Sequence, residues 1–340
     1  MKSIFFAILI LSSTFFIKVS YSQDIHFSQF FSSPLFLNPS NAGDFPGDYR
    51  FVLNNKNQWN SFTDAYSSFA GSIDAGFDNT FIKNSRSGIG LQINNDIAGD
   101  GRFGTTQLYL NLAYQLSLDK SQNFKLGLGF TGGYVMHGID FNKLYFGNQY
   151  DGERFDENLP SDEILSNHKM SYPDFATGIK LKYKYNHKFN FELGYSAYHF
   201  LQAKRSFFEN SEMILPIKHS TIAFAEYEIV NDFYLEAHFL HMLQQKHNEI
   251  NIGGIMRLDY NPINLQSLYF GALLRTSDAG IIVFGLKYHN FKICFNYDIN
   301  FSNLSTISKG KGGAEFSIIY IFLKPKPFQA PEYKKCPDFI

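Results

Sequence analysis

The stretch FKICFNYDINF, residues 291–301, alternates between apolar and polar side chains at every position. Its apolar members are Phe291, Ile293, Phe295, Tyr297, Ile299 and Phe301, and its polar members are Lys292, Cys294, Asn296, Asp298 and Asn300. Successive side chains of a β-strand point to opposite faces of the sheet. The stretch therefore predicts a strand with one apolar and one polar face.

The same period of two recurs along the chain from Tyr49 onward, for example in Leu108–Leu118, Phe124–Thr131 and Ile179–Tyr185. These segments run for about 10 to 14 residues, which suits tilted strands that cross hydrocarbon. A soluble β-sandwich would place its turns every 8–12 residues. The fold class predicted is all-β, a transmembrane outer-membrane antiparallel β-barrel of about 14 strands, an even number as in bacterial single-chain barrels. The strands are predicted to begin near Tyr49, Tyr66, Ser87, Phe103, Phe124, Tyr172, Phe189, Ile217, Phe233, Glu249, Leu268, Ala279, Phe291 and Gly312.

The composition agrees with a surface that alternates between lipid and water. The 340 residues include 38 Phe and 21 Tyr but one Trp, and only 18% of them are charged. This content favours a membrane barrel over an ordinary soluble secreted enzyme. The net charge of −1 points to no nucleic-acid or polyanion partner.

Residues 1–22 have the pattern of a secretory signal peptide. Lys2 supplies the positive charge, residues 4–17 form an uncharged apolar run, and Ser20 and Ser22 precede a cleavage site at Gln23. The alternative is a retained N-terminal anchor. The apolar run is shorter than a membrane-spanning helix requires, which favours cleavage.

Loop lengths predict how the barrel sits in the membrane. If the first strand runs outward, the connections after odd-numbered strands lie outside the cell and are the longer ones. The longest or most polar later connections, at 137–171, 201–216 and 302–311, all follow odd strands. The connection at 75–86 is longer than a periplasmic turn should be. Both termini are therefore predicted to be periplasmic.

Two segments are predicted to lie outside the barrel, which is assigned to residues 49–323. Residues 23–48 contain three prolines and two glycines without a clean period, so they form an irregular N-terminal segment, periplasmic or a plug. Their six large apolar side chains between positions 27 and 37 must be buried in the barrel mouth or against a partner. Residues 324–340 hold four prolines and are predicted to be a periplasmic tail.

Short motifs at both ends of the mature chain resemble the PorP/SprF family. The N-terminal ones are Gln23-Asp24, Phe27-Ser28-Gln29-Phe30, Pro34, Leu37-Asn38-Pro39 and Asn41-Ala42-Gly43. The later ones are Lys56-Asn57-Gln58-Trp59 with Ser72 and Asp74, and Cys336-Pro337 followed by Phe339. The sequence departs from the family pattern at Ser40, where Ala is usual, at Lys56 and Asp338, where Arg is usual, and by an additional Ile340.

This resemblance implies an outer-membrane component of the type IX secretion system that serves the delivery and surface anchoring of large adhesins, in gliding or adhesion. It implies as partners the C-terminal domain of a secreted adhesin and other type IX components in the periplasm, besides outer-membrane lipid. The candidate partner-binding or plug residues are Phe27, Gln29, Phe30, Asn38, Pro39, Gly43, Trp59 and Cys336.

The sequence carries none of the enzyme motifs G-x-S-x-G, P-loop or H-E-x-x-H, so no enzymatic activity, cofactor or metal is predicted. The acidic stretch 151–163 lacks the spacing of a calcium-binding EF-hand and is interpreted as a solvated loop. Cys294 and Cys336 are either free or paired, since export permits a disulfide. Ionisable residues of the polar face are expected to line a hydrated lumen or to pair across it; these are Glu192, Glu236, His238, Arg257, Asp259, Lys287 and Asp298.

Two classes of function remain. The first is a non-enzymatic secretion and surface-anchoring barrel, and the alternative is a porin-like solute channel of the outer membrane. The N-terminal motif favours the first class, because a simple channel has no need for such a segment.

Overall fold

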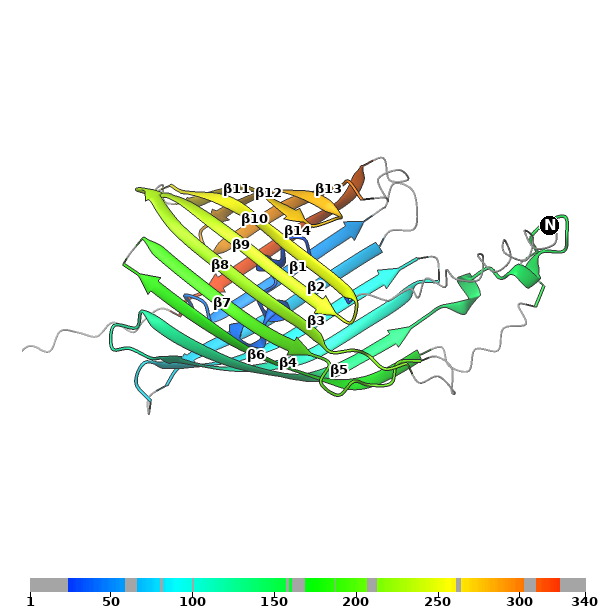
Figure 1. The fold of residues 1–340 in the computed structure, drawn as a ribbon, viewed down its shortest axis with the longest axis horizontal. Helices are drawn as coiled ribbons and strands as arrows, with labels where there is room; N and C mark the ends of the chain where they lie inside the picture. The colour runs from blue at the N-terminus through cyan, green and yellow to red at the C-terminus, as the bar shows by residue number, and fades with distance from the viewer. Residues whose placement is uncertain are drawn as a thin grey trace, which may run out of the picture.

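The protein forms a closed barrel of fourteen antiparallel strands, in which β1 (Tyr49–Gln58) pairs with both β2 (Tyr66–Asp78) and β14 (Lys311–Phe322). The structure is a computed structural model that describes residues 24–58, 66–79, 82–99, 101–156, 159–160, 169–186, 188–206, 213–260, 264–302 and 310–324. The strands tilt steeply against the barrel axis (Figure 1). The predicted fold class and the count of about 14 strands are confirmed.

Each strand pairs with its neighbours in chain order around the barrel. The remaining strands are β3 (Ser85–Ala98), β4 (Phe103–Ser117), β5 (Phe124–Gly138), β6 (Lys169–Tyr185), β7 (Phe189–Tyr198), β8 (Lys218–Val230), β9 (Phe233–Gln244), β10 (His247–Asp259), β11 (Leu265–Arg275), β12 (Ala279–Tyr288) and β13 (Phe291–Asn300). Within the described part of the chain, no helix is long and apolar enough to cross a membrane.

The alternation in residues 291–301 sorts the side chains of β13 between the two faces of the wall. Phe295 is 45% exposed on the outside, whereas Asn296 and Asp298 are fully buried on the inside. The same division holds around the barrel, because its outer face must meet lipid. The outward apolar side chains include Phe51, Leu53, Ile73, Ile89, Leu91, Leu108, Leu110, Leu112, Phe130, Ile179, Leu193, Leu235, Ile252, Leu268, Phe270, Phe284 and Phe316.

The two ends of the barrel differ in their connections. We call the end with the connections 139–168, 199–217 and 301–310 the loop end, and the other end the turn end. The β5–β6 connection carries the short 3-10 helices η3 (Phe141–Lys143) and η4 (Gly147–Gln149) and projects beyond the barrel (Figure 1). The β2–β3 connection, expected to be long, is only 79–84, because both strands extend further than predicted.

The tightest turns need backbone angles that most residues avoid. Residues 231–232, 245–246 and 289–290 each join two strands directly. Asp232, Gln245 and His289 there have φ values of 65°, 56° and 50°. Positive φ lets the twist of a two-residue turn match the twist of the flanking strands.

The outward face predicts a depth-dependent response to charge. Replacing Phe295 by Arg at the middle of β13 is expected to cost about 2–4 kcal/mol of barrel stability, since the cation would sit near the bilayer midplane. Replacing Phe301 by Arg, on the same face but past the strand end, should cost about 0–1 kcal/mol. Urea unfolding in lipid vesicles, followed by heat-modifiable migration on gels, measures both. Equal losses would show that the membrane is placed wrongly.

Candidate functional site

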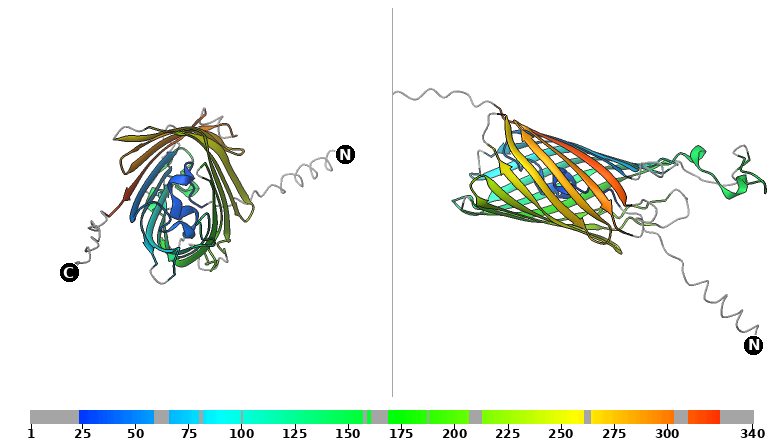
Figure 2. Two further views of the ribbon diagram at one scale, coloured as in Figure 1. Left: turned by 90° about the vertical axis from the view of Figure 1, so that its left-hand side faces the viewer. Right: turned by 90° about the horizontal axis from the view of Figure 1, so that it is seen from above.

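Residues 24–48, which we call the lumenal segment, run through the inside of the barrel (Figure 2). They contain three short turns of helix, η1 (Phe30–Ser32), α2 (Pro34–Leu37) and η2 (Pro39–Asn41). Pro34 and Pro39 each stand at the first position of their turn, where the fixed φ of proline suits a helix start. The turns replace the alternation of a strand, which explains why this part of the chain does not join the sheet.

The lumenal segment crosses the barrel from one end to the other. Asp24 lies at the loop end, where it contacts His199 and Lys218 beside the β7–β8 connection. Asp48 lies at the turn end, where its backbone N–H bonds the carbonyl of Phe322 and its carboxylate accepts from Lys324. The described chain therefore begins and ends at opposite ends of the barrel. This differs from the expectation that both termini lie together, because the apolar segment is buried inside the barrel rather than left on one side.

Glycines on the inner wall let the backbone and the Asn38 side chain of the lumenal segment approach closely. A Cβ atom at Gly88 would lie 1.9 Å from the Ala42 carbonyl oxygen, and one at Gly129 would lie 2.1 Å from the Ser40 nitrogen. Only glycine leaves room for such contacts. We call these inward residues the glycine belt; they are Gly76, Gly88, Gly129, Gly178 and Gly194, on β2, β3, β5, β6 and β7.

A buried group of four charges holds the first half of the segment. Asp298 Oδ2 accepts hydrogen bonds from Ser28 Oγ at 2.6 Å and from Arg275 at 2.8 Å. Glu315 accepts from the Ser28 backbone N–H and from Asn54, both at 2.8 Å. Lys56, 1% exposed, lies 3.8 Å from Asp298 and balances the charge. Buried charges persist only when paired and hydrogen-bonded, and the lumenal segment supplies part of that bonding here.

A second polar group holds the other half near the turn end. Arg50 donates two hydrogen bonds to Asp74, at 2.9 and 2.7 Å, and a third to the Asn41 carbonyl. Asp74 also accepts from the backbone N–H of Gly43, whose φ of +69° is one that glycine adopts readily. Asp44 forms ion pairs with Lys180 and Lys182. The segment is thus fixed to the wall through its backbone as well as its side chains.

The opposite wall of the lumen is apolar. Phe30 and Leu37 pack against inward residues of β9 to β12, namely Leu240, Met242, Ile255, Tyr269, Leu273, Ile281 and Val283. The expectation of a hydrated polar inner face is therefore wrong for this part of the barrel, where a hydrophobic core replaces water. Asn296 is fully buried rather than facing water, so an arginine there would not be tolerated. The expected pairing of lumenal charges is confirmed at Glu192, Glu236, Arg257 and Asp298.

The sequence-predicted site residues divide into two groups. Phe27, Gln29, Phe30 and Asn38 are 4% exposed or less, and with Pro39 and Gly43 they lie inside the barrel against its wall. Trp59 and Cys336 lie outside the described residues, as do residues 1–23, which include the predicted signal peptide, and residues 325–340. Asn38 donates from its side-chain amide to the carbonyls of Ile179 and Tyr195.

Sequence reasoning missed the wall residues that receive the lumenal segment. Arg275, Glu315 and the glycine belt were not among the candidates. The sequence did hold a sign of them, because each occupies an inward position of a predicted strand. A water-filled lumen requires neither a glycine nor a paired charge at such a position, so these residues point to a lumen that is occupied. No group of three or more His, Cys, Asp or Glu in the described chain is placed to hold a metal ion.

A closed antiparallel barrel with an apolar outer face and a lumen occupied by its own N-terminal segment defines an outer-membrane β-barrel of the filled type. The sequence then gives the family. The chain belongs to the type IX secretion system membrane protein PorP/SprF family, whose profile matches residues 19–320. The resemblance drawn from the N-terminal motifs is thereby confirmed.

The chain is also distantly similar to several solved channels and porins. The CymD monoaromatic hydrocarbon channel is 9% identical over 86% of this chain and 93% of the channel, with a TM-score of 0.49. A Pseudomonas aeruginosa FadL homologue is 9% identical over 86% and 94%, with a TM-score of 0.48, and the KdgM porin is 7% identical over 80% and 99%, with a TM-score of 0.37. No curated protein matches the sequence.

The glycine belt predicts that a side chain at Gly129 will displace the lumenal segment. Valine there would overlap the Ser40 backbone, and overpacking of this kind costs about 1–3 kcal/mol. We expect Gly129→Val to raise ion conductance in planar bilayers while the barrel still assembles. Gly280→Val is the matched control, because its Cβ meets nothing within 4 Å. Unchanged conductance in Gly129→Val would contradict the close contact.

The loop-end attachment predicts a pH dependence. Burial lowers the pKa of His199, but attraction to Asp24 and hydrogen bonds with Asp174 and Asp24 outweigh it and raise the pKa to about 9. Because an exposed imidazole titrates near 6.5, this attachment is fully stabilising below about pH 6.5 and is lost as pH rises through 9. Histidine NMR should show the high pKa, and Asp24→Asn should lower it. The variant His199→Gln identifies the NMR signal of His199. An unchanged pKa of His199 in Asp24→Asn would disprove the contact between His199 and Asp24.

Proposed function

We propose that this protein is a closed outer-membrane component of type IX secretion that delivers and anchors a large adhesin at the cell surface, for adhesion or gliding. Its partners are the C-terminal domain of that adhesin, other type IX components in the periplasm, and outer-membrane lipid. The protein acts by docking these partners and carries out no catalysis.

The observation that carries this proposal is the filled lumen. A porin-like solute channel keeps a wetted path between its two mouths. Here the lumenal segment runs from Asp24 to Asp48 and is tied to the wall by Asp298 and Glu315 near its start and by Asp74 and Lys180 near its end. Opening such a path would leave several buried charges without partners, at a cost of several kcal/mol. The porin alternative therefore has less support.

The orientation follows from the lengths of the connections. We place the loop end outside the cell and the turn end in the periplasm, since long connections are extracellular in bacterial barrels. Asp24 then lies at the outer mouth, and residues 324–340 form the periplasmic tail. This replaces the earlier expectation of two periplasmic termini. Residues 1–22 remain proposed as a cleaved signal peptide, and residues 49–323 as the barrel.

The outer surface offered to the adhesin is the projecting β5–β6 connection. Tyr145, Tyr150 and Phe155 are 67%, 56% and 43% exposed there. Aromatic side chains of this kind are enriched in protein interfaces, since they bury much area at low entropic cost. The roles of Phe27, Gln29, Phe30, Asn38, Pro39 and Gly43 are then those of a plug, and partner contacts are assigned to Trp59 and Cys336.

Gene deletion separates the two functions. Loss of this barrel should abolish surface display of one large adhesin and leave the uptake of small solutes unchanged, because the closed lumen carries no solute. Surface labelling of intact cells measures display, and uptake assays with small sugars and amino acids measure permeation. Restoration by the wild-type gene is the control. Normal display with reduced uptake would reject the secretion role and establish the channel.

A further inference from the structure

An open groove of about 690 Å³ lies on the outer wall of the barrel at the loop end, across strands β3 to β6. Met136 in its lining is 40% exposed and shares the outward face of β5 with Phe130 and Tyr134, so the groove is on the side of the wall that meets lipid. We call it the outer groove; the residues used below to describe it are Ile97, Arg102, Gly104, Met136, Gly138 and Lys169.

Two glycines give the outer groove its hollow shape. Gly104 on β4 and Gly138 on β5 lie opposite each other, with Ile97 and Lys169 next to them in the same row on β3 and β6. A Cβ atom at Gly138 would meet only the Lys169 side chain, at 4.0 Å, and one at Gly104 would meet nothing closer than 3.6 Å. Packing does not require glycine at either position, so the missing side chains leave space that the barrel itself does not use.

The outer groove lies at the depth of the lipid head groups. Leu110 stands at the middle of β4, and Gly104 lies six positions nearer the loop end. A strand that rises about 3.3 Å per residue and tilts by about 40° gains about 2.5 Å of height per residue, which puts Gly104 about 15 Å from the midplane. The apolar band of such barrels is about 25 Å tall and so ends about 12 Å from the midplane. The groove therefore begins where hydrocarbon gives way to head groups.

Two exposed cations stand at the outer groove, Arg102 in the β3–β4 turn and Lys169 at the first position of β6. Within the part of the chain that the structure describes, no carboxylate forms an ion pair with either of them. The described lining of the groove includes one carboxylate, that of Asp140. This lining therefore carries two positive charges against one negative charge, which favours an anion there.

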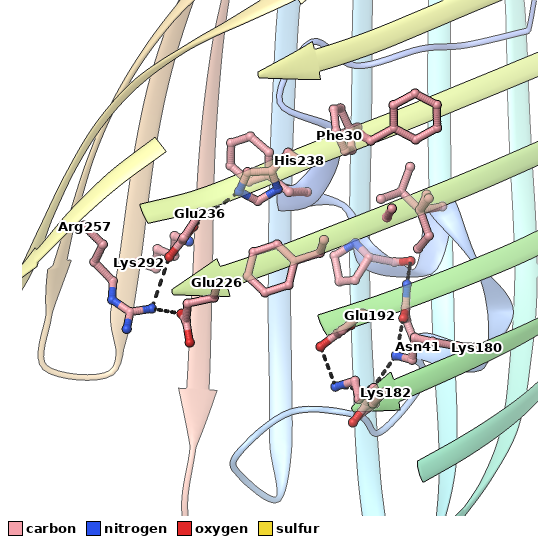
Figure 3. A pocket seen from close by; sticks show the side chains of 18 of the residues that line it. Phe30, Asn41, Lys180, Lys182, Glu192, Glu226, Glu236, His238, Arg257 and Lys292 are labelled. Carbon is pink, nitrogen blue, oxygen red and sulfur yellow. Dashed lines mark hydrogen bonds and ion pairs between the residues drawn. The ribbon is translucent and has the colours of Figure 1, made fainter. Parts of the chain in front are cut away.

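Cations inside the barrel differ in this respect. A cavity of about 310 Å³ lies beside the lumenal segment, and Arg257 there contacts both Glu226 and Glu236, while Lys182 contacts Glu192 (Figure 3). Each of these two cations has a carboxylate partner from the protein itself. The two cations of the outer groove have none in the described chain, so a partner for them must come from outside the protein.

We propose that the outer groove binds the phosphorylated head group of a membrane lipid. The phosphate would lie between Arg102 and Lys169, since a guanidinium fork and an ammonium group both suit phosphate oxygens. The acyl chains would follow the wall towards the midplane along Met136 and Leu108, which are 40% and 45% exposed. With the loop end outside the cell, as proposed above, this lipid is a phosphorylated glycolipid of the outer leaflet. Recognition of the phosphate depends neither on that orientation nor on the secretion role.

The test uses the full-length barrel in non-ionic detergent and native mass spectrometry, which measures the fraction of protein with a bound lipid. The probes are monophosphoryl lipid A and the same lipid after removal of its phosphate. The double variant Arg102→Gln with Lys169→Gln removes both cations of the groove. Lys120→Gln with Lys188→Gln is the matched control, because these two exposed lysines lie in connections at the turn end. Gly138→Leu keeps every charge but fills the groove.

We expect monophosphoryl lipid A to bind and its dephosphorylated form to bind about tenfold more weakly. The Arg102 and Lys169 double variant and Gly138→Leu should each show a similar loss, while the lysine control stays near wild type. No binding of lipid A, or equal binding of the two lipids, would overturn the proposal. Equal losses in the two charge variants, or full binding by Gly138→Leu, would also overturn it, since the lipid would then follow overall charge rather than the groove. The comparison of the two lipids on the wild-type protein decides the question even if a variant fails to assemble.

Discussion

The structure depends on the burial of Asp298 and Glu315 together with Lys56 and Arg275 inside the barrel wall. These four side chains are 2% exposed or less, so their charges need partners inside the barrel. The lumenal segment supplies hydrogen bonds to both carboxylates through the backbone N–H and the hydroxyl group of Ser28. The barrel and its N-terminal segment are therefore one folding unit, since each supplies buried hydrogen-bond partners to the other.

The two walls of the lumen are built for opposite faces of that segment. On β2, β3, β5, β6 and β7 the glycine belt brings the wall close to residues 38–43, where the Asn38 side chain and the Gly43 backbone N–H find polar partners. On β9 to β12 large aliphatic side chains such as Leu240 and Ile255 meet Phe30 and Leu37. Because its backbone is irregular, the segment can form hydrogen bonds with the polar wall and pack apolar side chains against the other wall. A regular strand or helix would present one pattern along its whole length.

The outer face of the barrel could be predicted from the sequence, and its contents could not. Lipid imposes a strict period of two on residues such as Phe295 and Ile299, so strand positions follow closely, with the largest deviations at the starts of β6 and β11. Tyr172 and Leu268 were expected as first residues, but Lys169 and Leu265 begin these strands, because pairing continues past the clear alternation. Ser28 and Glu315 are 287 positions apart, and their contact follows only once the barrel has closed. Local sequence patterns cannot predict a contact between residues so far apart in the chain.

The position of the lumenal segment before the first strand bears on the order of events during biogenesis. A barrel seals when its first and last strands meet, here at the seam where Tyr49 faces Phe322. The segment contacts Asp298 on β13 and Glu315 on β14, which form the last hairpin of the barrel to be synthesised. The last strands therefore bind a part of the chain that precedes the first strand. Glu315 lies on β14, which pairs with β1 at the seam, and it also binds Ser28 of the lumenal segment. Closure of the barrel therefore depends on the lumenal segment. In a barrel without that segment, Asp298 and Glu315 of the last hairpin would lose hydrogen-bond partners, and the pairing of β1 with β14 would be less stable.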